Sequence, residues 1–172
     1  MRQKLGRGRF GSAFFIIFDA ALVLPWHLGN ILLFLAPMSN AIIVHDQEQA
    51  VAALEAAQEL DVPVTLVSAP GAAAYLGATV FRDMVLNAAE IFPGARYQAV
   101  LDCGDEPGLA LGALRHGIKG VRIHNGPELS EKLADIAEQR GAFVYTEKSD
   151  ELDLHGMTTP AAACRAWLRD AK

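Results

Sequence analysis

The sequence predicts one α/β domain over residues 38–172, built on a mostly parallel sheet of five strands with flanking helices. Short runs rich in β-branched residues alternate with helical patterns, which is typical of βα units and a parallel sheet. These runs are almost entirely apolar, as in strands that are covered on both faces. A chain of 172 residues can also bury a core without disulfides. The pattern fits either an open sheet of the Rossmann or flavodoxin type or half of a (β/α) barrel.

The first βα unit begins with the run AIIV at residues 41–44. Asp46 is the expected N-cap of the next helix, and Gln49 stands at the reciprocal position of a capping box. Four apolar residues at helical spacing then form the expected buried face: Val51, Leu54, Ala57 and Leu60.

The second unit has a strand over 62–67, a turn at 68–71 and one long helix that Pro93 and Gly94 end. Five residues form the expected core stripe of that helix: Tyr75, Val80, Met84, Val85 and Ala88.

Three further strands are expected over residues 97–101, 120–123 and 142–145. Gly117 ends the helix after the first of them, and Pro127 opens the helix after the second. The inward residues of these two helices are Leu109, Ala113, Leu114, Leu129, Leu133, Ile136 and Ala137. An acidic loop at 147–153 leads to a last helix that begins at Thr159 and Pro160 and buries Cys164, Trp167 and Leu168.

Charge and cysteine content narrow the function classes. Residues 1–37 contain four basic residues and one acidic residue, whereas the remainder contains 11 basic and 19 acidic residues, a net charge of −8. An acidic domain is poorly suited to a phosphate backbone, so we expect no nucleic-acid partner. Cys103 and Cys164 form no CxxC or similar spacing, which argues against a disulfide framework and favours the reducing cytoplasm.

Residues 1–37 form a separate apolar segment after a basic start. A membrane span needs about 20 consecutive apolar residues, but Asp19 and Pro25 interrupt the run. Three interpretations stay open: a mis-assigned start with Met38 as the true initiator, an export signal or membrane anchor, and an extra packed helix. A membrane partner is expected only if the segment is a genuine signal or anchor.

Four residues after the predicted strands have no evident capping or turn role: His45, Asp102, Cys103 and His124. Ligands of parallel α/β proteins bind at the carboxyl ends of the strands, where these side chains should converge. With His45, Cys103 and His124 as ligands, they could hold a divalent metal. Asp102 and His124 could equally form a catalytic acid/base pair. The sequence therefore leaves the identity of any cofactor undecided between a divalent metal and none.

The turn from Ser68 to Gly71 precedes a helix and could present backbone N–H groups to a phosphate or carboxylate. Together with Asn125, His45 and Cys103, Ser68 and Gly71 are the candidate ligand-binding residues. The turn matches neither glycine-rich nucleotide motif. Ser68, Gly71 and Asn125 are also ordinary turn residues, so a structural role is the alternative.

One stretch resembles a known family. Leu101-Asp102-Cys103-Gly104, with ALRHG at 113–117 and VRIHNG at 121–126, is similar to a βαβ unit of class II fructose-bisphosphate aldolases. These metal-dependent (β/α)-barrel enzymes carry L-D-H-G, A-I-x-x-G and V-M-I-D-G at similar spacing. The resemblance implies that Asp102 matches the catalytic acid and Cys103 the position of a zinc ligand. Cysteine replaces histidine there, and His124 replaces an aspartate, so the likeness implies barrel-like geometry rather than aldolase activity.

Three functions follow as hypotheses. The domain binds a small anionic metabolite at the carboxyl-terminal rim of the sheet, with or without catalysis. Alternatively, it is a metal-dependent lyase that resembles the aldolases, or a non-catalytic regulatory or assembly module. Because part of a barrel leaves sheet edges uncovered, we expect a homo-oligomer.

Overall fold

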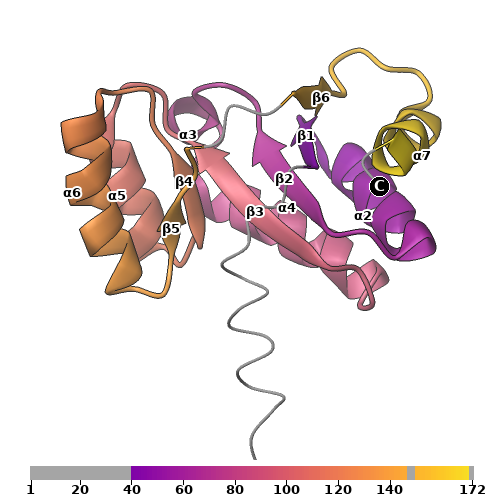
Figure 1. Ribbon diagram of the computed structural model, residues 1–172, viewed down its shortest axis with the longest axis horizontal. Helices are drawn as coiled ribbons and strands as arrows, with labels where there is room; N and C mark the ends of the chain where they lie inside the picture. Colours follow the sequence, from indigo (N-terminus) through magenta and orange to yellow (C-terminus); the bar gives the residue numbers. More distant parts are fainter. Residues whose placement is uncertain (1–39, 147–149, 171–172) are drawn as a thin grey trace, which may run out of the picture. The chain divides into compact units, whose positions relative to one another are not determined.

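The computed structural model of the protein describes residues 40–146 and 150–170 (Figure 1). The predicted apolar segment over 1–37 and the proposed start at Met38 lie outside these residues. None of the helices in the two described ranges has the length and hydropathy that crossing a bilayer requires.

The described residues form a parallel sheet of six strands with helices between them (Figure 1). The strands are β1 (Ala41–Val44), β2 (Val64–Ser68), β3 (Tyr97–Asp102), β4 (Gly120–Arg122), β5 (Phe143–Val144) and β6 (Glu151–Asp153). The helices are α2 (Gln47–Leu60), α3 (Ala72–Tyr75), α4 (Ala78–Ile91), α5 (Pro107–Arg115), α6 (Pro127–Glu138) and α7 (Pro160–Asp170). The predicted parallel α/β fold is confirmed, with one strand more than expected.

The strand order β5-β4-β3-β2-β1-β6 distinguishes between the two predicted architectures. Strands β1 to β5 follow one another without the reversal that defines a doubly wound sheet. Because βα crossovers are right-handed, this order places the connecting helices on one face. The main core cluster joins residues of α2, α4, α5, α6 and α7 to one face of the strands. A second cluster, Ala41, Ile43, Val67, Val100 and Tyr145, contains no helical residue. The fold is therefore the barrel-like one.

The sheet is strongly curved. Arg122 on β4 and Glu151 on β6 form an ion pair with Nη1 and Oε1 2.6 Å apart, although β3, β2 and β1 lie between their strands. Four strand spacings of a flat sheet amount to about 19 Å, more than these two side chains can span together. The strands must therefore bend around the face that carries both residues, as in part of a barrel.

The start of α2 forms largely as predicted and also fixes β6. Asp46 caps the helix by accepting a hydrogen bond from the Gln49 N–H at 2.8 Å. Gln49 Oε1 accepts from the backbone N–H of His45, one residue before the position that a capping box uses. Its Nε2 donates to the carbonyl of Leu154, which follows β6, at 3.1 Å. One side chain thus joins the end of β1 to the end of β6.

Three sequence predictions are wrong in detail. The expected acidic loop over 147–153 contains β6. The expected long helix is two helices, since Gly77 adopts φ +84 between them. Tyr75, in α3, is 69% exposed rather than buried. Val80 is 53% exposed, because the buried face of α4 is centred on Phe81, Met84, Val85 and Ala88. Ile136, which was expected to face inward, is 38% exposed; the buried residues of α6 are Leu133 and Ala137.

Gly120 gives the first testable prediction. A Cβ at this position would lie 2.6 Å from the carbonyl oxygen of Ala99 and 2.7 Å from Cζ of Phe143. We expect Gly120→Ala to lower the free energy of unfolding by about 2 kcal/mol, as overpacking does. Gly112→Ala in α5 is the matched control, since its Cβ would meet nothing within 4 Å, and it should stabilise by about 0.5–1 kcal/mol. Urea denaturation of both variants measures the difference; equal stabilities would contradict the prediction.

Candidate functional site

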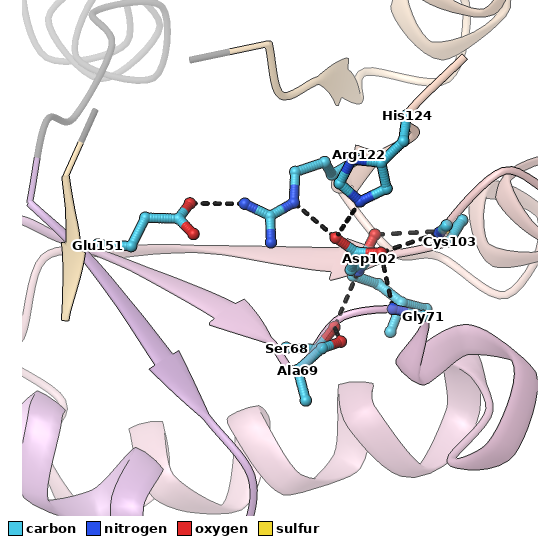
Figure 2. Close-up of polar contacts among 10 residues, drawn as sticks. Ser68, Ala69, Gly71, Asp102, Cys103, Arg122, His124 and Glu151 are labelled. Carbon is cyan, nitrogen blue, oxygen red and sulfur yellow. Dashed lines mark hydrogen bonds and ion pairs between the residues drawn. The ribbon is translucent and has the colours of Figure 1, made fainter. Parts of the chain in front are cut away.

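Asp102, the last residue of β3, is completely buried and lies at the centre of a polar cluster (Figure 2). Its Oδ1 accepts hydrogen bonds from the backbone N–H groups of Gly71 at 2.8 Å and Gly104 at 2.9 Å. Its Oδ2 lies 2.6 Å from Nε of Arg122 and 3.0 Å from Nε2 of His124. The carboxylate therefore joins the loop after β2, the loop after β3 and the end of β4.

The two loops are shaped around this carboxylate. Gly71 and Gly104 have φ values of +65 and +56, which glycine adopts without the strain of a side chain. The Ser68 hydroxyl accepts a hydrogen bond from the Asp102 N–H at 2.8 Å and donates to the carbonyl of Ala69 at 3.2 Å. Ser68 and Gly71 were predicted to bind an external anion. In the structure the anion that Gly71 binds is the carboxylate of Asp102.

These contacts keep Asp102 ionised. Burial by itself raises the pKa of the carboxyl group. The hydrogen bonds from Gly71 and Gly104, together with the hydrogen bond and positive charge of Arg122, outweigh burial, and the net pKa lies below the ordinary value of 3.8. At neutral pH the side chain is thus a hydrogen-bond acceptor only.

Arg122 connects two carboxylates. Its Nε donates to Asp102 and its Nη1 donates to Glu151, each at 2.6 Å. The side chains of Arg122 and Glu151 are only 13% and 17% exposed. The sequence prediction missed both residues, because it placed Arg122 inside a strand and Glu151 in a loop. A signal was available, since an arginine within an otherwise apolar strand needs a buried counterion.

His124 is the cluster's exposed member. Its side chain is 50% exposed, and its backbone N–H donates to the carbonyl of Gly104 at 3.0 Å. Because the ionised Asp102 can only accept, the neutral imidazole must carry its proton on Nε2, and the lone pair is on Nδ1. A carboxylate that orients an imidazole in this way is the arrangement of a general base and its positioning residue. The predicted pair of Asp102 and His124 is thus brought together.

Cys103 lies apart from this cluster. Its side chain is 1% exposed and belongs to the core cluster on the helix side of the sheet. Its thiol donates to the carbonyl of Leu101 at 3.6 Å. Burial, and secondarily the negative charge of Asp102, raises the pKa of Cys103 to about 12. The thiol therefore stays protonated and packs in the core, apart from the polar groups around Asp102.

His45 follows β1, three strands away from β4 in the described sheet and next to β6. Its Nε2 is 2.7 Å from Oδ1 of Asp153, and its ring centroid is 4.9 Å from that of His155. The structure does not bring the predicted metal ligands His45, Cys103 and His124 together. Within residues 40–146 and 150–170, no group of three histidine, cysteine, aspartate or glutamate side chains is placed to hold a metal ion.

Asn125, the last predicted ligand-binding residue, follows His124 on the loop after β4. Its Oδ1 is buried and accepts no hydrogen bond from the described residues.

Comparison with known proteins supports the resemblance to aldolases as a partial one. No protein-family model matches the chain. A class 2 fructose-bisphosphate aldolase of Synechocystis is 33% identical over 92 residues, which are 54% of this chain and 26% of the aldolase. A plasmid-encoded fructose-bisphosphate aldolase of Cupriavidus necator is 38% identical over 83 residues, 48% of this chain and 24% of the aldolase. The chain thus spans about a quarter of the length of these curated relatives.

A solved structure gives the same architecture. A protein of Coccidioides immitis assigned as a fructose-1,6-bisphosphate aldolase superimposes with a TM-score of 0.51 and 21% sequence identity. The match covers 67% of this chain and 44% of that protein. It supports the barrel-like fold. The metal that the resemblance implies does not fit here, because the cysteine at its expected ligand position is buried in the core on the helix side of the sheet.

Asp102→Asn tests how much the buried carboxylate stabilises the fold. We expect the variant to lower the free energy of unfolding at neutral pH by about 3 kcal/mol, because Arg122 loses one of its two buried partners. The folded pKa of Asp102 lies below its unfolded value, so its contribution is complete above the unfolded pKa and is lost as pH falls through the folded pKa.

The wild-type protein should therefore lose stability below about pH 5 more steeply than the variant does. Urea denaturation over a series of pH values measures both slopes. Asp83→Asn is the control, since Asp83 forms an exposed pair with Arg82 and should change stability by less than about 0.5 kcal/mol. Parallel pH profiles for wild type and Asp102→Asn would contradict the prediction.

The two cysteines provide a further test. Both are buried, and burial raises the pKa of Cys103 to about 12 and that of Cys164 to about 11. Neither thiol of the folded protein should react with an aromatic disulfide reagent at about pH 8, whereas both should react after denaturation. Rapid labelling of Cys103 in the folded protein, located by peptide mass, would show that its thiol is accessible.

Proposed function

We propose that the domain binds a small phosphorylated hydroxyketone at the carboxyl-terminal ends of β3 and β4 and transfers a proton to and from it through His124. The observation that carries the proposal is the contact between the ionised Asp102 and Nε2 of His124, which are 3.0 Å apart. The side chain of His124 is half exposed, so a small molecule can reach it. Nδ1 of that ring is the base, and Asp102 is its positioning residue.

The reaction step is proton abstraction beside a carbonyl group. The C–H bond of the substrate breaks, its electron pair passes into an enolate, and the proton goes to Nδ1 of His124. The resulting imidazolium carries a proton on both nitrogens, and the charge of Asp102 stabilises it. Asp102 itself does not take the proton, because each of its oxygens already accepts two hydrogen bonds.

The substrate class comes from the relatives, whose names specify fructose-bisphosphate aldolases. The ketose half of fructose 1,6-bisphosphate is dihydroxyacetone phosphate, whose carbon beside the carbonyl carries a removable proton. The burial of Cys103 favours a step that uses no metal held at that position. The unpaired thiols also favour the cytoplasm as the site of this activity.

Hydrogen exchange tests the proposal directly. The purified protein, treated with a chelator, is incubated with dihydroxyacetone phosphate in D2O, and NMR follows the loss of the substrate's C–H signal. We expect exchange above the uncatalysed rate in the wild type and a decrease of about 100-fold or more in His124→Gln, as for removal of a general base. His116→Gln, which alters an exposed histidine at the C-terminal end of α5, is the matched control and should exchange at the wild-type rate.

Two results would overturn the proposal. One is a wild-type rate equal to that of the buffer alone, and the other is equal exchange by wild type and His124→Gln. Exchange by the chelator-treated wild type above the buffer rate supports the metal-free form of the step.

A further inference from the structure

We propose that Glu151 is a positioning residue that keeps one oxygen of Asp102 open to His124. This inference rests on the proposed function of His124, and it assigns a role to a strand that the sequence prediction missed. Glu151, Arg122, Asp102 and His124 form a continuous row in which each neighbouring pair is in contact (Figure 2). The first three side chains alternate in charge, and the row ends at the imidazole.

The geometry of Arg122 decides what Glu151 does. A guanidinium group can bind one carboxylate through two parallel hydrogen bonds, which is its strongest arrangement. Here it does not. Only Nε of Arg122 donates to Asp102, and Nη1, on the other side of the guanidinium from the Nε–H, donates to Glu151. Arg122 is therefore held by two carboxylates at once, with one donor committed to each.

This division matters because Oδ2 of Asp102 serves two donors. It accepts from Arg122 at 2.6 Å and lies 3.0 Å from Nε2 of His124. Without Glu151, the whole guanidinium would be free to reorient, present its two terminal nitrogens to Asp102 and compete with His124 for the same oxygen. The imidazole would then lose the contact that places its proton on Nε2.

The position of Glu151 is itself fixed by the fold. Glu151 pairs with Ala41 in the register of β1 and β6. Three contacts hold the other end of the strand: Leu154 N–H to the carbonyl of Ile43 at 3.1 Å, Gln49 to Leu154, and His45 to Asp153. Glu151 thus enters the site from a strand whose other end is anchored to β1 and α2.

The test is the protonation pattern of the His124 ring, which two-bond proton–nitrogen NMR correlations report at a pH where the ring is neutral. We expect wild-type His124 to carry its proton almost entirely on Nε2. In Glu151→Ala the ratio of the Nε2–H to the Nδ1–H form should fall by about tenfold, toward that of the exposed ring of His116 in the same spectrum. Glu151→Gln, which keeps the shape and an acceptor oxygen, should give an intermediate ratio and remains informative if the alanine variant does not fold.

Asp153→Asn is the matched control, because it makes the same change from carboxylate to amide on the same strand but does not touch Arg122. It should leave the ratio for His124 unchanged. An unchanged ratio in both Glu151 variants overturns the inference. An equal fall in Glu151→Gln and Asp153→Asn also overturns it, since loosening of β6 would then explain the effect.

The measurement needs no substrate, so it separates this inference from the proposed function. If wild type exchanges no substrate hydrogen but the ratio falls in the Glu151 variants, the proposed reaction is wrong and the role of Glu151 in orienting His124 holds. If exchange depends on His124 but the ratio does not respond, the reaction holds and the role of Glu151 is wrong.

Discussion

The carboxylate of Asp102 is the interaction on which the site depends. A buried negative charge is costly unless every lone pair has a partner, and here the partners come from three parts of the chain. Two are backbone N–H groups in glycine turns, one is a guanidinium group and one is an imidazole. Because all four partners bind the same carboxylate, Asp102 fixes the loops after β2 and β3 and the end of β4 relative to one another.

Most of the fold was predictable because it depends on local patterns. The apolar run at 41–44, the Asp46 cap and the proline that opens α6 each act within a few residues, so the sequence shows them directly. The errors arose where a distant contact or a backbone angle decides. Gly77 breaks a helix through a positive φ that the apolar pattern does not reveal. The acidic residues 151–153 form a strand because they pair with β1, which their local pattern does not show.

The site, too, was predictable in part. Strand ends could be read from the sequence, and they correctly brought Asp102 and His124 to one place. The prediction that Cys103 lies beside Asp102 did not use the alternation of side chains along a strand. Cys103 follows Asp102 in the chain, so the alternation of a strand turns it to the opposite face, where it enters the core. Arg122 and Glu151 escaped prediction because the contact between them requires the curvature of the whole sheet.

The placement of β6 has a consequence for how the protein folds. The first strand of the described sheet pairs with the last, and the contact between His45 and Asp153 closes a loop of 108 residues. Contacts so distant in sequence form late, because the chain entropy lost in closing the loop is recovered only when the intervening units are in place. During synthesis Arg122 is made before Glu151, so the guanidinium has Asp102 as its first carboxylate partner. Arg122 therefore gains its second carboxylate, Glu151, only when the last strand pairs with β1.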